Sequence, residues 1–132
     1  MQTSLRFARL YPDEAGVSHF GQVEVPVSLQ QFAPPASPFR VSALATASQC
    51  GFLHLPAGWV GEMHPSPSRM WIFMLSGAME FEAGDGGVLE IAPGSALLLE
   101  DTVGDGHTSR VVGNVPATLA AVRLPRAASQ EP

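Results

Sequence analysis

Two histidines far apart in the chain, His64 and His107, carry the side chain most often used for acid/base or metal chemistry near neutral pH. His64 lies in the segment Gly61–Gly77 (GEMHPSPSRMWIFMLSG), and Glu62 precedes it by two residues. An imidazole beside a carboxylate can bind a divalent cation or move protons, and an imidazole can also simply pack. The residue types alone leave all three roles open for His64.

Short strands must position these side chains. From residue 41 onward, apolar runs alternate with turn signals rich in Gly, Pro and Asp, a pattern typical of a β-sandwich or barrel. The runs predict strands at 51–55, 69–75, 78–83, 88–91, 96–99, 109–112 and 117–124. No window has a convincing helical period, so the sequence predicts an all-β domain.

The run 69–75 (RMWIFML) is apolar on both of its alternating faces. Met70, Ile72 and Met74 share one face, and the other face carries two aromatic rings and a leucine beside Arg69. We therefore expect both faces of this strand to be covered, one of them by the core and the other by a further surface.

The first forty residues contain several prolines, which interrupt every candidate ladder. They predict an irregular arm that packs on the barrel with at most an edge strand. The predicted organisation is an N-terminal arm over 1–40, a barrel over 41–126 and a flexible C-terminal tail over 127–132.

The balance of charge limits the partners. The formal net charge is −5, and the seven cationic residues are arginines scattered singly along the chain. A surface that follows phosphates needs clustered cations, so nucleic acid and anionic membranes are poor candidates. We expect a small organic ligand instead, one that is neutral or cationic.

The single cysteine, Cys50, cannot form an intrachain disulfide. The start of the chain has no basic patch followed by a long apolar run, so we predict a cytoplasmic protein with no secretory signal and no membrane span. Because Cys50 precedes an apolar run, we interpret it as a small packed hydrophobe and not as a nucleophile.

One set of positions resembles a known motif. Gly58, His64, Ser66, Met70 and Gly77 have the spacing of the first cupin motif, in which a Gly, two His, a Glu and a closing Gly take these places. Of the three usual ligands, His64 alone is present, since serine and methionine stand where the family has the second His and the Glu.

The stretch from Gly94 to His107 resembles the second cupin motif, with a longer turn. Together, PAGWVGEMHPSPSR and PGSALLLEDTVGDGHTSRVVG look like a group of small bacterial single-domain cupins, and the resemblance covers most of the chain. It implies a cupin-type antiparallel β-barrel, a small jelly-roll-like double-stranded β-helix. The cupin barrel hosts many chemistries, so the resemblance fixes no activity.

Inward residues alternate along each strand of such a barrel. If His64 points inward, Glu62 and Ser66 do so too, and His107 would face them from another strand. Glu62, His64 and His107 are therefore the candidate catalytic residues. The same three are the candidate ligands of a divalent Fe, Mn, Ni or Zn ion.

Met70 argues against a metal, since a thioether donates weakly to a hard cation. Without a metal, Glu62 and His64 would form an acid/base pair in an apolar pocket, which suits lyase, isomerase, dehydratase or cyclase chemistry on a small, largely apolar molecule. The alternatives are a non-catalytic ligand-binding cupin, a metal-dependent dioxygenase-like cupin, and a structural partner whose barrel face is a dimer interface. We expect a homodimer.

Further residues are candidates for lining the substrate site or supporting it. The predicted substrate-binding set is His54, Trp59, Ser66, Arg69, Met70, Ile72 and Met74. Trp59 would close the pocket mouth, and His54 also has a purely structural interpretation.

Arg69, Asp101 and His19 are expected to support the fold or the site. Arg69 is expected to pair with Glu100 or Asp101, and Asp101 could instead position His107 through its second ring nitrogen. His19 is expected to anchor the arm.

Overall fold

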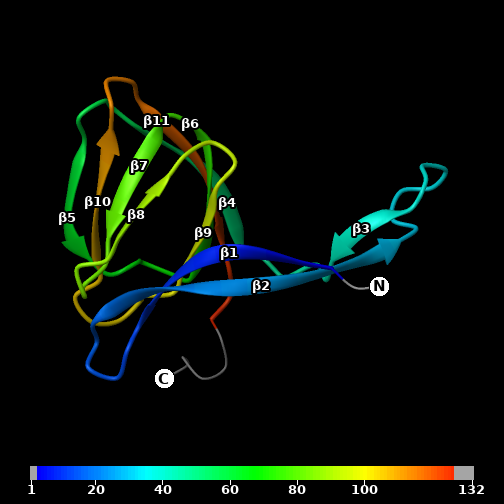
Figure 1. Ribbon diagram of the computed structural model, residues 1–132, viewed down its shortest axis with the longest axis horizontal. Helices are drawn as coiled ribbons and strands as arrows, with labels where there is room; N and C mark the ends of the chain where they lie inside the picture. Colours follow the sequence, from blue (N-terminus) through cyan, green and yellow to red (C-terminus); the bar gives the residue numbers. More distant parts are fainter. Residues whose placement is uncertain (1–2, 127–132) are drawn as a thin grey trace.

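The computed structural model describes residues 3–126, and strands are the regular elements of this part of the chain (Figure 1). The strands are β1 (Thr3–Pro12), β2 (Ser18–Gln30), β3 (Phe39–Ser42), β4 (Gln49–Leu55), β5 (Val60–His64), β6 (Met70–Ser76), β7 (Ala78–Glu82), β8 (Val88–Ile91), β9 (Ala96–Leu99), β10 (His107–Val112) and β11 (Ala117–Arg123). Within residues 3–126 there is no helix with the length and apolar character needed to cross a membrane.

The strands form two sheets that face one another. The larger sheet has the order β3-β2-β1-β9-β6-β11-β4, and the smaller has the order β5-β10-β7-β8 (Figure 1). All ladders are antiparallel except β1 with β9, which are parallel. The all-β prediction is therefore confirmed, as a sandwich of two sheets that do not close into one continuous barrel.

The predicted strands after residue 41 match the observed ones to within two residues at each end. The core lies between the sheets, where alternate residues of each strand are buried. In β6, Met70, Ile72 and Met74 are buried as expected. The opposite face is less covered than predicted: Trp71 packs edge-on against Phe7, whereas Phe73 and its neighbour Leu75 are exposed.

The N-terminal arm differs from its prediction, because it is a long regular hairpin. Ten residue pairs join β1 to β2, from Thr3 with Val27 to Pro12 with Ser18. The prolines do not break this ladder. Pro12 ends β1, and Pro26, which pairs with Ser4, lies one residue before the part of β2 that pairs with β3.

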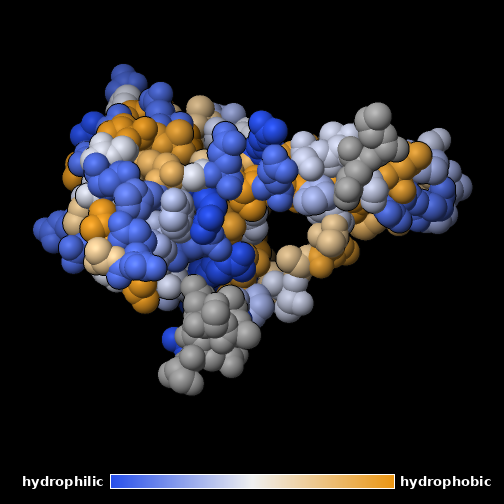
Figure 2. All heavy atoms as spheres, turned by 60° about the horizontal axis from the view of Figure 1, so that its bottom comes forward, coloured by the Kyte–Doolittle hydropathy of each residue, from blue (hydrophilic) through white to orange (hydrophobic). Residues whose placement is uncertain are grey.

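The inner end of the hairpin belongs to the body, because Ala8–Leu10 of β1 pair with β9. Its outer end, with β3, projects away from the body (Figure 1). Figure 2 shows hydrophobic side chains on this projecting arm as well as on the body. Leu29, Phe32 and Phe39 are among the exposed ones. The prediction for 127–132 falls outside the described residues.

Cys50 is also placed differently from its prediction. It lies in β4, the outermost strand of the larger sheet, and its side chain is exposed instead of packed. An apolar run at the edge of a sheet need not be covered on both faces, which the sequence pattern does not reveal.

Candidate functional site

A cavity of about 300 Å³ lies between the two sheets. Its walls are mainly apolar, with Ile72, Phe81 and Leu119 among them, and both His64 and His107 line it. The two rings come from the ends of the neighbouring strands β5 and β10, and their centroids are 5.1 Å apart. The two histidines singled out in the sequence therefore meet at this cavity, where His107 is buried and His64 is exposed.

His107 is fixed by a buried carboxylate. The residue is 3% exposed, and its Nδ1 lies 2.6 Å from Oδ2 of Asp101, which is fully buried. An ionised carboxylate can only accept, so Nδ1 of His107 carries the proton. The predicted role of Asp101 in positioning His107 is confirmed by this contact, and Nε2 is left as the ring nitrogen available to a ligand.

The second oxygen of Asp101 is also satisfied. The hydroxyl of Ser66 donates to Oδ1 at 2.7 Å, and the backbone N–H of Ser66 donates to the carbonyl of Asp101 at 2.9 Å. Ser66 thus stands where cupins have a second histidine, and here it holds the group that orients His107. A buried carboxylate with each oxygen hydrogen-bonded is a stable arrangement, whereas one left without donors would be costly.

His64 is oriented by its own backbone. Its Nδ1 donates to the carbonyl oxygen of Glu62 at 2.7 Å. Because a carbonyl can only accept, Nδ1 of His64 carries a proton as well. Both rings of the cavity therefore keep Nε2 as the nitrogen with a free lone pair when they are neutral.

Glu62 does not join the two histidines. Its side chain is exposed and does not line the cavity. The reason is a bulge in β5. Gly61 pairs with Ser109 and His64 pairs with His107, so β5 has two residues between these pairs where β10 has one. The extra residue shifts the alternation, so that Gly61 and His64 face inward while Glu62 lies outside.

The donors present do not fit the predicted metal site. Among residues 3–126, no three side chains of His, Cys, Asp or Glu are arranged to hold a metal ion. Glu62 lies away from the cavity, Asp101 is engaged by Ser66 and His107, and Met70 occupies the cavity wall. Two imidazoles remain, one fewer than the three protein ligands of a typical catalytic zinc site.

The predicted substrate-binding residues separate into two groups. Trp59, Ser66, Met70 and Ile72 line the cavity, while Met74, Arg69 and His54 do not. Met74 is packed in the core further along β6.

Arg69 and His54 lie outside the cavity. Arg69 pairs with Glu100, one of its two expected partners. His54 is exposed on β4 and hydrogen-bonds the hydroxyl of Thr118.

Sequence reasoning missed several cavity residues. Ser109 lies two positions after His107, and Phe81 and Leu119 lie on the buried faces of their strands. Alternation counted from His107 would have found Ser109, because neighbours two apart in a strand share a face.

His19 anchors the arm as predicted. Its Nε2 lies 2.6 Å from Oδ2 of Asp13 and its Nδ1 lies 2.8 Å from Oδ2 of Asp85, in the turn between β7 and β8. The hydrogen bond with Asp13 raises the pKa of His19. In turn, the pKa of Asp13 is lowered by His19, and the pKa of Asp85 is lowered first by the backbone N–H of Gly87 and then by His19.

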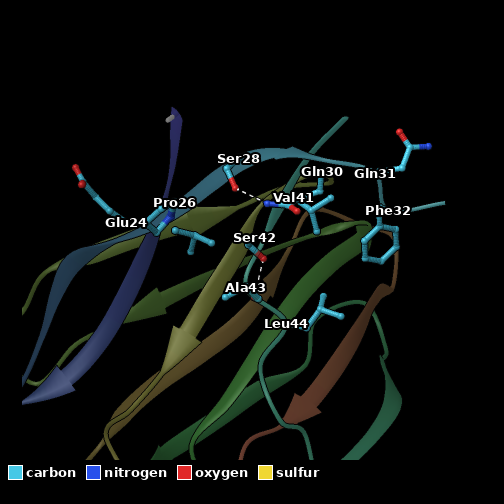
Figure 3. A pocket seen from close by; sticks show the side chains of 11 residues that line it. Glu24, Pro26, Ser28, Gln30, Gln31, Phe32, Val41, Ser42, Ala43 and Leu44 are labelled. Atoms are coloured by element: carbon cyan, nitrogen blue, oxygen red, sulfur yellow. Dashed lines mark hydrogen bonds between the residues drawn. The ribbon is translucent and has the colours of Figure 1, made fainter. Parts of the chain in front are cut away.

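A larger concavity, of about 790 Å³, lies on the projecting arm, along β2 and β3 (Figure 3). Phe32 and Leu44 lie at one end of it and Glu24 at the other. Glu24 is paired with Arg6, and no second titratable side chain lines the hollow. It therefore lacks the paired groups that acid/base chemistry needs.

No family model matches the sequence, and no curated protein is significantly similar to it. Among solved structures, the chain is similar to the cupin domain of Cnp3 from Schizosaccharomyces pombe, with 13% identity over 92% of this chain and 84% of that one, at a TM-score of 0.46.

Two further structures are similar at the same level. A putative ethanolamine utilization protein Q from Salmonella typhimurium is 12% identical over 93% of this chain and 98% of that one, at a TM-score of 0.41. A conserved protein of unknown function from Streptococcus pyogenes is 19% identical over 67% of this chain and 74% of that one, at a TM-score of 0.47. At these values the likeness is one of outline, and it assigns no activity to this chain.

Proposed function

We propose that the chain is an enzyme that moves protons on a small, largely apolar organic molecule bound in the cavity, in a reaction of the isomerase or lyase type. One observation carries this proposal: two imidazoles lie 5.1 Å apart in the cavity, and each has its Nδ1 proton held by a fixed acceptor. Both rings are thereby kept in the tautomer that leaves Nε2 free to accept or donate a proton.

His107 is the proposed base. Nε2 of its neutral ring takes a proton from the substrate, and the positive charge that develops is stabilised by Asp101 through the Nδ1 hydrogen bond of 2.6 Å. His64, when protonated, returns a proton from its own Nε2 to another atom of the substrate. The net result is a proton transfer that needs no oxidant and no second substrate.

The surroundings of the two rings favour small apolar ligands. A cavity of about 300 Å³ is at the lower end of the range for ligand sites. His107 and Asp101 are themselves buried, which strengthens the hydrogen bond between them. Glu62, outside the cavity, has no part in this mechanism, and no step depends on a metal.

The proposal can be tested with small enolisable ketones, cyclopentanone and acetophenone, incubated with the protein in D2O. Loss of the signal of the protons next to the carbonyl, followed by ¹H NMR, measures the proton transfer directly. His107→Ala should lower the exchange rate by about a hundredfold or more, the effect typical of removing a general base. His54→Ala is the matched control, because it removes an exposed histidine outside the cavity, and the rate should stay the same.

Two results would contradict the proposal. If a ketone perturbs the amide signals of cavity residues but exchanges no faster than with His107→Ala, the catalytic part is wrong and the chain is a small-molecule binder. If neither ketone perturbs those signals, the cavity is not a site for such ligands at all. ¹⁵N spectra of the histidines give an independent check, since both rings should carry their proton on Nδ1 when neutral.

A further inference from the structure

A second concavity, of about 540 Å³, gathers arginines that are far apart in the sequence. We propose that this cleft binds an organic oxyanion, a ligand that carries phosphate or carboxylate groups. Arg9 comes from β1, Arg69 directly precedes β6 and Arg126 follows β11, and all three line the cleft. This site is separate from the proposed catalytic cavity and does not depend on it.

Charge is the first support for this ligand class. The chain has a formal net charge of −5, yet three of its seven arginines face one cleft, against a single lining carboxylate, Glu100. A concave surface lined by one sign of charge concentrates ligands of the opposite sign. The cleft is therefore a local cationic site on an acidic protein.

The free donors of the arginines are the second support. Nε of Arg9 donates to Oε1 of Glu100 at 2.8 Å, and Nε of Arg69 donates to Oε2 at 2.8 Å. Each guanidinium has five N–H groups, and this contact uses one of them. Within residues 3–126, the terminal nitrogens of Arg9 and Arg69 have no hydrogen-bond partner, so they remain for a ligand.

Glu100 also holds the two guanidinium groups in place. The guanidinium of Arg9 is further supported by the ring of Tyr11, since its Cζ lies 4.2 Å from the ring centroid. Planar guanidinium groups with fixed orientation match the oxygens of phosphates and carboxylates in pairs of hydrogen bonds. A site in which the cations are ordered before the ligand arrives loses less entropy on binding.

The size of the cleft points to an organic ligand and not to a bare ion. A volume of about 540 Å³ is larger than that of the apolar cavity and far exceeds what one phosphate group fills. Tyr11 and Leu124 provide surface for the uncharged part of such a molecule.

Isothermal titration calorimetry with glucose 6-phosphate, citrate and inorganic phosphate tests this proposal on the full chain at low and at physiological salt. We expect glucose 6-phosphate or citrate to bind, more weakly at the higher salt concentration because the site is charged and partly exposed. Binding of the phosphate ester alone indicates a phosphorylated ligand, and binding of citrate alone indicates a carboxylate. Binding of both identifies a site for either group.

Arg9→Gln and Arg126→Gln should each weaken binding about tenfold, the loss expected for one charge-assisted contact. Arg126→Gln leaves both ion pairs of Glu100 intact, so it is informative even if Arg9→Gln fails to fold. Arg110→Gln is the matched control, because Arg110 pairs with Glu80 away from the cleft. His107→Ala should also bind the anion normally, which separates this site from the catalytic one.

The proposal is overturned if none of the three anions binds at roughly 10 mM and low salt. It is also overturned if a folded Arg126→Gln binds as tightly as the original chain, or if Arg110→Gln weakens binding as much as Arg126→Gln does. The last result would show attraction to surface charge in general.

Discussion

The cavity and the arginine cleft are built from the same stretches of chain but have opposite chemistry. Met70 lines the cavity and its neighbour Arg69 lines the cleft. In the same way, Leu99 lines the cavity and its neighbour Glu100 lines the cleft. Successive side chains of an extended strand point to opposite sides, so one segment serves both hollows. In the cavity, Ser66, His107 and Ser109 are buried, and His64 and Arg123 are exposed. In the cleft, the side chains of the paired Arg9, Arg69 and Glu100 are charged and partly exposed.

This difference in burial indicates how strongly the free energy of unfolding depends on the polar groups of each hollow. The buried groups beside the cavity, His107, Asp101 and Ser66, depend on one another for their hydrogen bonds, since water cannot replace a buried partner. In the cleft, water screens the ion pairs, and loss of one arginine leaves Glu100 with the other. Substitutions should therefore affect the free energy of unfolding far more in the cavity than in the cleft.

The largest effect is expected from Asp101→Ala. It leaves the buried N–H of His107 and the hydroxyl of Ser66 without their acceptor, which should lower the free energy of unfolding by about 3 kcal/mol. Urea unfolding followed by circular dichroism measures this. Asp105→Ala, at an exposed position of the same loop, is the control and should be nearly neutral, so equal losses would contradict the contrast.

A smaller effect is expected from Gly61→Ala, beside Trp59 of the cavity wall. A Cβ at this position would collide with the ring of Trp59. The ring must shift, at a cost of about 1–2 kcal/mol in the free energy of unfolding, and tryptophan fluorescence should change with it. Gly51→Ala is the matched strand glycine, because a Cβ there meets no atom within 4 Å. If Gly61→Ala leaves both stability and fluorescence unchanged, Trp59 does not form the wall described.

Arg69→Gln probes the cleft side of the comparison. The ion pair with Glu100 is partly exposed and Arg9 remains, so the free energy of unfolding should fall by at most about 1 kcal/mol. Arg6→Gln, which removes an exposed pair with Glu24, should have no measurable effect. A loss for Arg69→Gln as large as that of Asp101→Ala would show that the cleft is as sensitive as the cavity.

The His19 anchor lies outside both hollows and gives the smallest expected effect, a dependence of stability on pH. The pKa of His19 is raised from 6.5, so its stabilising contribution is complete below that value and is lost as the pH rises through the folded-state pKa. The pKa values of Asp13 and Asp85 are lowered from 3.8, so their contribution is present above that value and is lost as the pH falls through the folded-state values.

Both contributions are therefore complete between these two ordinary pKa values. Urea midpoints measured from about pH 5 to about pH 9 should fall for the original chain and change less for His19→Gln. His54→Gln should follow the original chain, because His54 contacts a hydroxyl and no carboxylate. A pH profile of His19→Gln identical to that of the original chain would contradict the role of this anchor.

Most strands of the body could be predicted because alternation and glycine-rich turns are local properties of the sequence. The exception is β5, the strand that carries His64, which the pattern of apolar runs did not predict. The meeting of His64 and His107 followed from the spacing of the cupin-like motifs. The hairpin of the arm was missed because a proline weakens a strand only where its N–H is needed, and that depends on which neighbours lie beside it.

Two features of the candidate sites were beyond the local pattern. The position of Glu62 depends on a bulge, which alternation within one strand does not disclose. The arginine cleft depends on three segments that meet only in the folded chain, so cations that are single in the sequence become neighbours in space. The predicted homodimer and the cytoplasmic location stay predictions.

The bulge in β5 has a consequence for how such a cavity changes over time. Insertion or deletion of one residue between Gly61 and His64 would reverse which side chains of this part of β5 point into the sandwich and which point outward. No residue type would have to change. A carboxylate could thus enter or leave the interior through an insertion or a deletion alone. Chains of this shape can acquire or lose an acidic group in the cavity in one genetic event.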